Sequence, residues 1–242
     1  MAAGFEIFSA SGMLQASSEY ITQGLSKSGV ISAGMDPVKP LVRFYGYHVH
    51  VAVSGVNPVL FIGAGTNSIC RYVIKSGSTF TFGYDVETLP FSYYIFDNMT
   101  PRGNSGVEVY NASGALTFTS NRQPLRIVWA GVPQGVYTGG DILLNFSDRN
   151  AHPFAVLPNG SYAINQGYGR LGYQTWSGDT TGDFLAEMMS ATSSGYSWQW
   201  QYIRSPSEPG DQPAFDTRMI IETYGMPFAS LIDVSRCPLP FG

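Results

Sequence analysis

The chain has 242 residues, a net charge of −4 and only 12% charged residues, about half the roughly 25% of an average soluble protein. Because it contains no basic run, the sequence argues against a nucleic-acid partner bound through phosphates. No apolar run approaches the roughly 18–20 residues that span a bilayer, and residues 1–6 lack the features of a secretory signal, so we expect no membrane insertion and assembly in a cytosol.

The composition favours β structure. There are 28 Gly, 15 Tyr and 15 Phe, and short alternating apolar runs separated by Gly, Pro, Asn and Ser continue along the chain. We predict a mainly all-β fold, an antiparallel β-sandwich or barrel-like sheets with repeated β-hairpins and at most one short helix. Few charges with many aromatic residues also suit a surface covered by neighbouring subunits.

The first predicted element is a segment that occurs twice. Residues 4–14 read GFEIFSASGML, and residues 106–116 read GVEVYNASGAL. Both copies alternate apolar and polar residues and turn at Ser-Gly, which is the pattern of a β-hairpin. We expect two superimposable hairpins in which Glu6 and Glu108 occupy equivalent positions. Chance recurrence is the alternative, because Ala-Ser-Gly is a common string in a chain rich in Gly and Ser.

Further strands follow in chain order. The strand candidates are residues 41–53, 59–62, 70–74, 79–84, 91–96, 125–129, 142–146, 197–203 and 217–224. The segments 131–135 and 138–141 read as turns or loops. They suggest an N-terminal β region (residues 1–130) that holds the duplicated hairpin and a C-terminal β region (residues 131–242), with one continuous domain as the alternative.

One short helix is predicted over residues 183–189. The segment is rich in helix formers, and Asp183 is placed to cap its first turn. Gly182 and the Ser-rich residues 190–195 limit its length.

Two histidines and two cysteines raise the question of metal and disulfide chemistry. His48 and His50 lie two apart in a predicted strand and therefore share a face. A metal would need a further ligand, and the only other histidine is His152, so we predict no metal site and interpret the pair as the polar face of a half-buried sheet. Cys70 is expected to be a buried thiol, and its pairing with Cys237 is left open.

Aromatic residues gather in two places. Tyr196, Trp198, Trp200 and Tyr202 share one face of a predicted strand, and core, subunit interface and ligand platform are all open interpretations, of which core is preferred. The stretch 167–179 reads as Gly-rich loops that bear aromatic side chains, and such loops are where binding concentrates. We therefore predict ligand or partner contact at three of its residues: Tyr168, Tyr173 and Trp176.

Catalytic motifs are lacking. The sequence contains neither G-x-S-x-G nor H-E-x-x-H, although Asp179, Asp183 and Glu187 could in principle supply a glycosidase pair. We predict a protein that is not an enzyme and has no cofactor.

The duplicated phrase carries a resemblance to a known family. An opening like residues 4–14 soon after the initiator Met, and the later phrase VYNASGALTFTS (residues 109–120) followed by a basic, apolar strand (residues 124–128), resemble minor tail and tail-fibre proteins of tailed bacteriophages. The resemblance covers the first half of the chain. It implies a virion structural protein of the tail, with other tail proteins as partners, a homo-oligomeric state and contact with a host surface receptor or glycan.

Two functions from other classes stay open. The Trp- and Tyr-rich second half would suit a non-catalytic carbohydrate-binding module. The carboxylates named above would suit a depolymerase-like glycosidase.

Overall fold

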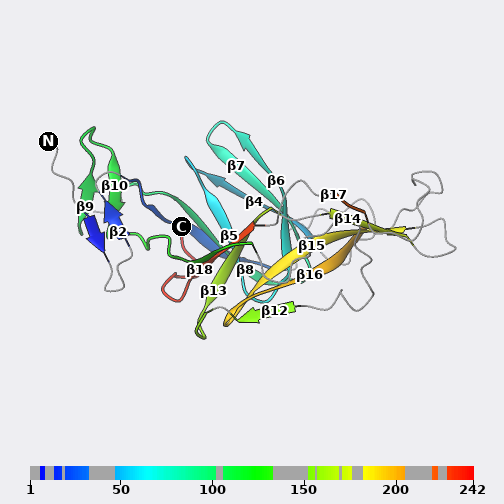
Figure 1. The fold of residues 1–242 in the computed structure, drawn as a ribbon. Coiled ribbons are helices and arrows are strands. Elements are labelled where there is room, and N and C mark those ends of the chain that lie inside the picture. The colour runs from blue at the N-terminus through cyan, green and yellow to red at the C-terminus, as the bar shows by residue number, and fades with distance from the viewer. Residues whose placement is uncertain are drawn as a thin grey trace.

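Every regular element in the described residues is a β-strand. The computed structural model describes residues 6–8, 14–17, 20–32, 47–101, 106–132, 152–155, 157–168, 171–175, 182–204, 220–222 and 228–242. Within these ranges all strand pairs are antiparallel, and no element is a helix (Figure 1). The predicted all-β class with repeated hairpins is confirmed.

Two open sheets form the body of the molecule. The six-stranded sheet has the order β11-β18-β13-β5-β8-β3, and the larger sheet has the order β12-β16-β15-β6-β7-β4. The strands of the first are β3 (Gln23–Ile31), β5 (Val59–Gly63), β8 (Phe91–Asn98), β11 (Ile127–Gly131), β13 (Tyr162–Tyr168) and β18 (Phe228–Asp233). Those of the second are β4 (Tyr47–Ser54), β6 (Ser68–Ser76), β7 (Thr79–Val86), β12 (His152–Ala155), β15 (Gly182–Thr192) and β16 (Gly195–Arg204).

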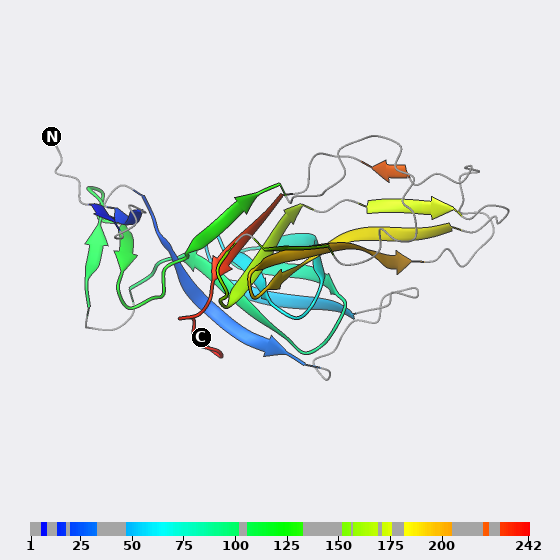
Figure 2. The same ribbon diagram turned by 60° about the horizontal axis from the view of Figure 1, so that its bottom comes forward.

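Two further strands extend the larger sheet at one end. β14 (Leu171–Thr175) pairs with β15 on one side and with β17 (Ile220–Glu222) on the other. Figure 2 shows this extension and the hairpins at opposite ends of an elongated molecule.

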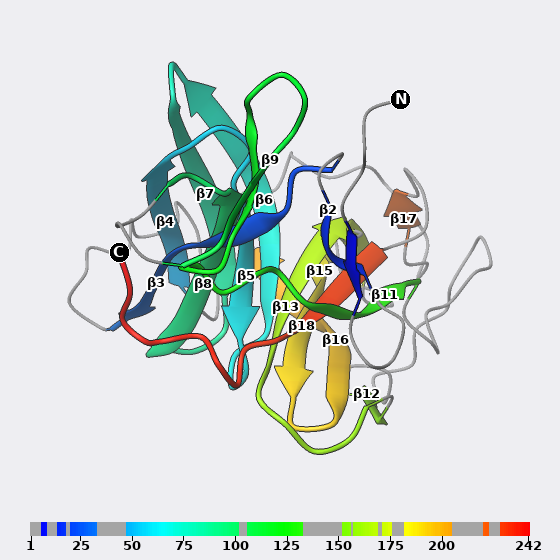
Figure 3. The same cartoon turned by 90° about the vertical axis from the view of Figure 1, so that its left-hand side faces the viewer.

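The chain contains the same strand arrangement twice. In chain order β3 to β8 build half-sheets β3-β8-β5 and β4-β7-β6, and the later strands build β11-β18-β13 and β12-β16-β15 in the same order. Each set follows one copy of the hairpin. We call β1 to β8 the first unit and β9 to β18 the second; β14 and β17 are additions to the second. Figure 3 shows the two units side by side.

The units join edge to edge through corresponding strands. Ile62 of β5 lies opposite Ile164 of β13, and Gly63 lies opposite Ala163. In the larger sheet Ser68 of β6 lies opposite Met189 of β15. Residue 130 itself falls inside β11, the first sandwich strand of the second unit. The division into regions of residues 1–130 and 131–242, with one continuous domain as the alternative, stays a prediction.

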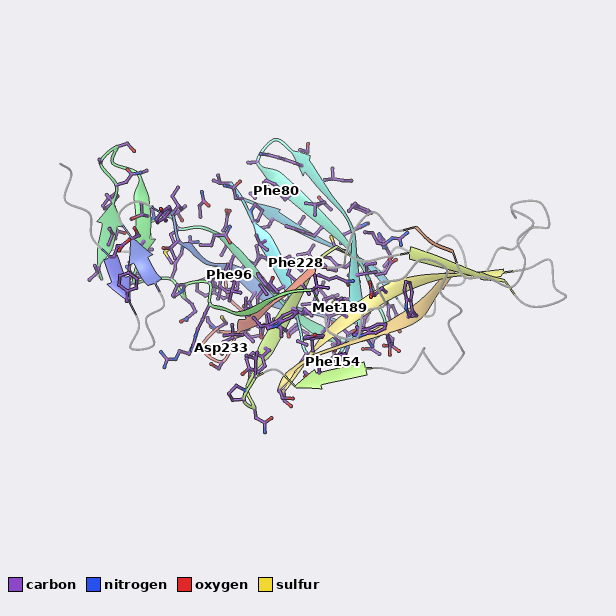
Figure 4. All side chains as sticks on the ribbon, in the orientation of Figure 1. Phe80, Phe96, Phe154, Met189, Phe228 and Asp233 are labelled. Atoms are coloured by element: carbon purple, nitrogen blue, oxygen red, sulfur yellow. The ribbon has the colours of Figure 1, made fainter. Side chains whose placement is uncertain are left out.

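Each unit has its own core between the two sheets. In the first unit the inward residues of β4 and β7 meet those of β5 and β8, and Val51, Phe82 and Ile95 are all at most 5% exposed. In the second unit Tyr196 stacks on Trp129 and on Phe154 from two other strands. Figure 4 shows the side chains that fill this space. Burial of alternate residues from facing sheets is what stabilises a sandwich.

The C-terminal tail covers the outer face of the six-stranded sheet. Residues of β5, β8 and β13 on that face are buried beneath Val234 and pack against Cys237 and Phe241. The tail is held by backbone hydrogen bonds between Ser28 and Phe241 in both directions, and by the Ser28 hydroxyl, which donates to the Pro238 carbonyl over 2.6 Å. Val234, Cys237 and Phe241 of the tail therefore contribute to this outer hydrophobic cluster, while most of the other tail residues are exposed.

The two predicted hairpins form with the same register. β1 (Glu6–Phe8) pairs with β2 (Leu14–Ser17), and β9 (Glu108–Tyr110) pairs with β10 (Leu116–Thr119). Glu6 lies opposite Ser17 and Glu108 opposite Thr119, and each hairpin has a register shift at the corresponding position. Glu6 and Glu108 therefore occupy equivalent positions, as the repeated phrase predicts.

The predicted helix over residues 183–189 is wrong. These residues lie within β15, an eleven-residue strand that pairs with β16 along its length, and with β14 and β6 on its other side. Met188 and Met189, successive residues that face opposite sides of the strand, are both fully buried. A helix would have buried one stripe only, so tertiary pairing overrides the local helix preference.

Replacement of Trp200 should strongly destabilise the protein. Its side chain is 2% exposed in the core of the second unit, so Trp200→Ala should lower the free energy of unfolding by about 3–5 kcal/mol. Urea denaturation followed by circular dichroism measures this. The control is Val73→Ala, at a side chain that is 50% exposed, which should change stability by less than about 0.5 kcal/mol. Equal losses of stability in the two variants would contradict the placement of Trp200 in the core.

The two cysteines are free thiols. Burial, with a smaller contribution from the Asp233 carboxylate, raises the pKa of the Cys237 thiol to about 11. At pH 9 we therefore expect iodoacetamide to alkylate Cys237 about 50-fold more slowly in the folded protein than in urea, because the thiolate is the reactive form. Peptide mass spectrometry measures both rates. Equal rates, or a Cys70–Cys237 disulfide in unreduced protein, would contradict this expectation.

Candidate functional site

The aromatic row of the second unit belongs to the core. Tyr196, Trp198 and Trp200 are between 0% and 4% exposed and lie between the sheets, while the side chain of Tyr202 lies outside the described residues. The preferred interpretation as core is therefore confirmed for the three described side chains, and they cannot serve as a flat exposed platform for a sugar.

The predicted contact residues lie on strands where the structure describes them. Tyr168 ends β13 in the six-stranded sheet, and Tyr173 is central in β14, which belongs to the other sheet. Tyr173 lies opposite Phe184 on one side and Ile220 on the other. The expected Gly-rich loop at this point is wrong, because pairing on both sides makes residues 171–175 a strand. Trp176 and the side chains of both tyrosines lie outside the described residues.

The carboxylates considered for glycosidase chemistry do not form an observed pair. Glu187 is fully buried in β15. Asp179 and the side chain of Asp183 lie outside the described residues. Another buried carboxylate, Asp97, accepts backbone N–H groups of Val56 and Asn57 at 2.9 and 2.7 Å. Asp97 thus holds the β4–β5 turn and has a structural role.

The duplicated hairpins meet at one end of the molecule, which we call the hairpin end. β10 lies beside β2, and the side chains of Ser17, Thr117 and Thr119 are at most 1% exposed there. Among the described residues, five of the fifteen exposed large apolar side chains belong to this end: Phe8, Tyr20, Ile21, Val107 and Tyr110. This end therefore offers apolar contact area outside the two cores.

The tip of the second hairpin is tightly structured. The side-chain oxygen of Asn111 accepts hydrogen bonds from the backbone N–H groups of Ser113 and Ala115 at 3.1 and 2.8 Å, and from the Ser113 hydroxyl at 2.7 Å. Gly114 has a φ of +80°, which favours glycine. The Asn-x-Ser-Gly string thus encodes a rigid Asx-type turn.

A second cluster of polar groups lies on the outer face of the larger sheet. It joins His48 and His50 of β4, Tyr72 of β6 and Asp85 of β7. His48 Nε2 lies 3.1 Å from His50 Nε2 and 3.2 Å from the Tyr72 hydroxyl, and the Tyr72 hydroxyl also contacts His50 Nε2. Two imidazole nitrogens and one phenol oxygen, from two non-adjacent strands, therefore converge on one point.

Asp85 fixes the orientation of His48. Its Oδ1 lies 2.6 Å from His48 Nδ1, and its Oδ2 lies 3.5 Å from Arg71 Nε. Because a carboxylate only accepts hydrogen bonds, Nδ1 carries a proton, and in the neutral form of the ring the lone pair is therefore at Nε2. The side chains of His48 and Asp85 are 17% and 12% exposed, so this bond is shielded from bulk water.

Gly83 makes the convergence possible. It lies on β7 between His50 of β4 and Tyr72 of β6, paired with both. A Cβ at this position would overlap with the Tyr72 ring, so the missing side chain lets the ring cross the central strand. A register shift between Cys70 and Tyr72 helps to aim it.

The third histidine is far from this cluster in the sheet. His152 lies on β12, the edge strand opposite β4. In the described part of the chain no three His, Cys, Asp or Glu side chains gather as metal ligands. The third ring at the cluster is a tyrosine, which the spacing of histidines and acidic residues in the sequence does not indicate.

Within the described residues, no helix is long and apolar enough to cross a membrane.

Comparison of the chain with protein-family models, with curated proteins and with solved structures finds no match. Any function must therefore be argued from these sites and from the phrases in the sequence.

The role of Gly83 can be tested by a double-mutant cycle. Gly83→Ala should cost about 1–3 kcal/mol of stability by overpacking against the Tyr72 ring. In a Tyr72→Ala background the same change should be neutral or stabilising, because the obstacle is gone and alanine suits a strand better than glycine. Urea denaturation of the four proteins should give a coupling of at least about 1 kcal/mol. Additive effects would contradict the packing described.

Proposed function

We propose that the chain is a structural component of a tailed-bacteriophage virion, a minor tail or tail-tip/fibre-associated protein that docks on neighbouring subunits. The observation that carries the proposal is the repeated phrase. The residues that resemble tail proteins form the same hairpin twice, with one register, at one end of the molecule. A segment that is used twice and kept out of both sandwich cores is more economically explained by contact with partners than by stability.

The chemistry of the hairpin end supports this role. Phe8, Val107 and Tyr110 are about half exposed, and aromatic side chains such as Phe8 and Tyr110 are enriched at protein interfaces. The hydrogen bonds to the Asn111 side chain hold the turn of the second hairpin in one conformation, which lowers the entropy cost of association. Other tail proteins and further copies of this chain are the proposed partners. Contact of a host receptor or glycan with Tyr168, Tyr173 and Trp176 stays a prediction from the sequence.

Purified particles test the proposal. We expect the chain in the virion of the phage whose genome encodes it, detected by mass spectrometry after density-gradient purification. Particles made without it should lack a complete tail or fail to adsorb. Its absence from particles, with normal tails made without it, would overturn the proposal. Turnover of a polysaccharide, or glycan binding without any role in particles, would favour the glycosidase or the carbohydrate-binding module instead.

Self-association gives a second test. We expect a homo-oligomer, or a complex with tail proteins, that buries more than about 800 Å² per subunit. Light scattering measures the mass. Val107→Asp should weaken the association, because it places a charge at the hairpin end. Val73→Asp, at a similarly exposed position in β6, should not weaken it. A monomer at high concentration that also fails to join particles would contradict this.

A further inference from the structure

We propose that His48, His50 and Tyr72 form a binding site for a divalent transition-metal ion, with Zn²⁺ as the best match. The site is independent of the virion role proposed above, and it departs from the sequence expectation of no metal. The sequence expectation considered only His152 as a third ligand, whereas the structure brings the Tyr72 phenol from β6 to the two histidines.

The geometry of the three heteroatoms suits a tetrahedral ion. Zn²⁺ binds imidazole nitrogen at about 2.0–2.1 Å, which separates ligand atoms in a tetrahedron by about 3.3–3.4 Å. His48 Nε2 lies 3.1 Å from His50 Nε2 and 3.2 Å from the Tyr72 hydroxyl, and these two separations are within a few tenths of an ångström of that spacing. The contact between His50 Nε2 and the Tyr72 hydroxyl is shorter than that spacing, so these two groups would move apart when they share an ion. The two imidazole planes are perpendicular, with centroids 4.8 Å apart, so both rings can aim at one point without stacking.

The protonation pattern also suits a cation. In a neutral His48 the bond to Asp85 leaves a lone pair at Nε2, where a metal would sit. This carboxylate–histidine pair is the arrangement that orients metal-bound histidines. When both imidazoles and the phenol are neutral, the three heteroatoms share at most two protons, so hydrogen bonds join at most two of the three close pairs. An ion accepts all three lone pairs, and the phenol proton then leaves to solvent.

The location allows entry and a stabilising role. His50 is exposed and Tyr72 is 37% exposed, so an ion can reach the site and a water can complete its coordination. The three ligands link the edge strand β4 to β6 across β7. A bound ion would therefore fasten the edge of the larger sheet to the β6–β7 hairpin, whose outer part has exposed Val73 and Ile74.

Calorimetric titration of the full chain, without a polyhistidine tag and after treatment with a chelator, tests the site with Zn²⁺. We expect one ion per chain and a higher melting temperature with Zn²⁺. His50→Gln should weaken binding by more than about 100-fold, and Asp85→Asn by about 10–100-fold, as loss of a supporting partner does. His152→Gln is the matched control and should leave binding unchanged. Mg²⁺ should not compete, because it prefers oxygen ligands.

Two further variants examine the tyrosine. Zn²⁺ should produce the ultraviolet difference spectrum of a phenolate, and Tyr72→Phe should abolish that spectrum and weaken binding while keeping the ring. Gly83→Ala should weaken binding because it displaces the Tyr72 ring. Melting curves in chelator show whether each variant is folded. Tyr72→Phe, which keeps the aromatic ring, still tests the site if another variant does not fold.

Several results would overturn the proposal. They are no Zn²⁺ binding by the wild-type chain, binding that His50→Gln leaves intact, or equal loss in His152→Gln. Mg²⁺ binding as tight as Zn²⁺ binding would also overturn it. None of these results bears on whether the chain is found in virions, so the two proposals fail separately.

Discussion

The edge-to-edge pairing of β5 with β13 is the interaction on which the rest of the fold depends. It joins two half-sheets through Ile62 opposite Ile164, both at most 1% exposed. Only this short antiparallel stretch, with the Ser68–Met189 pair in the other sheet, makes two continuous sheets from two units. Without it each unit would expose a central strand edge, and an unpaired edge is a site of aggregation.

The C-terminal tail is a second feature that joins the two units. The outer face of the six-stranded sheet carries Phe61 and Phe96 from the first unit and Ile232 from the second. An apolar face shared by both units cannot remain open to water at low cost. The tail covers it, and its bonds to Ser28 of β3 connect the last residues of the chain to one of its first strands. The two units are thus stabilised together.

The two units share a strand order but have different outer surfaces. In the first unit β7 carries Gly83, and the space above it brings Tyr72 to the histidines of β4. In the second unit the corresponding strand β16 has Gln199, which is 8% exposed, and β15 gains β14 as a neighbour. The polar cluster described above therefore belongs to the first unit.

The sequence by itself determined the β class, most first-unit strands and the two hairpins, because alternation and Ser-Gly turns are local signals. It also placed His48 and His50 on one face, since the period of a strand is two. It failed at residues 183–189, where strong helix formers lie in a strand that is paired on both sides. The repeated strand order was hidden because, beyond the hairpins, the two units share little recognisable sequence. Only tertiary structure brought Tyr72 to the histidines and placed His152 at the far edge, because sheet order and register are set by which faces must be buried together.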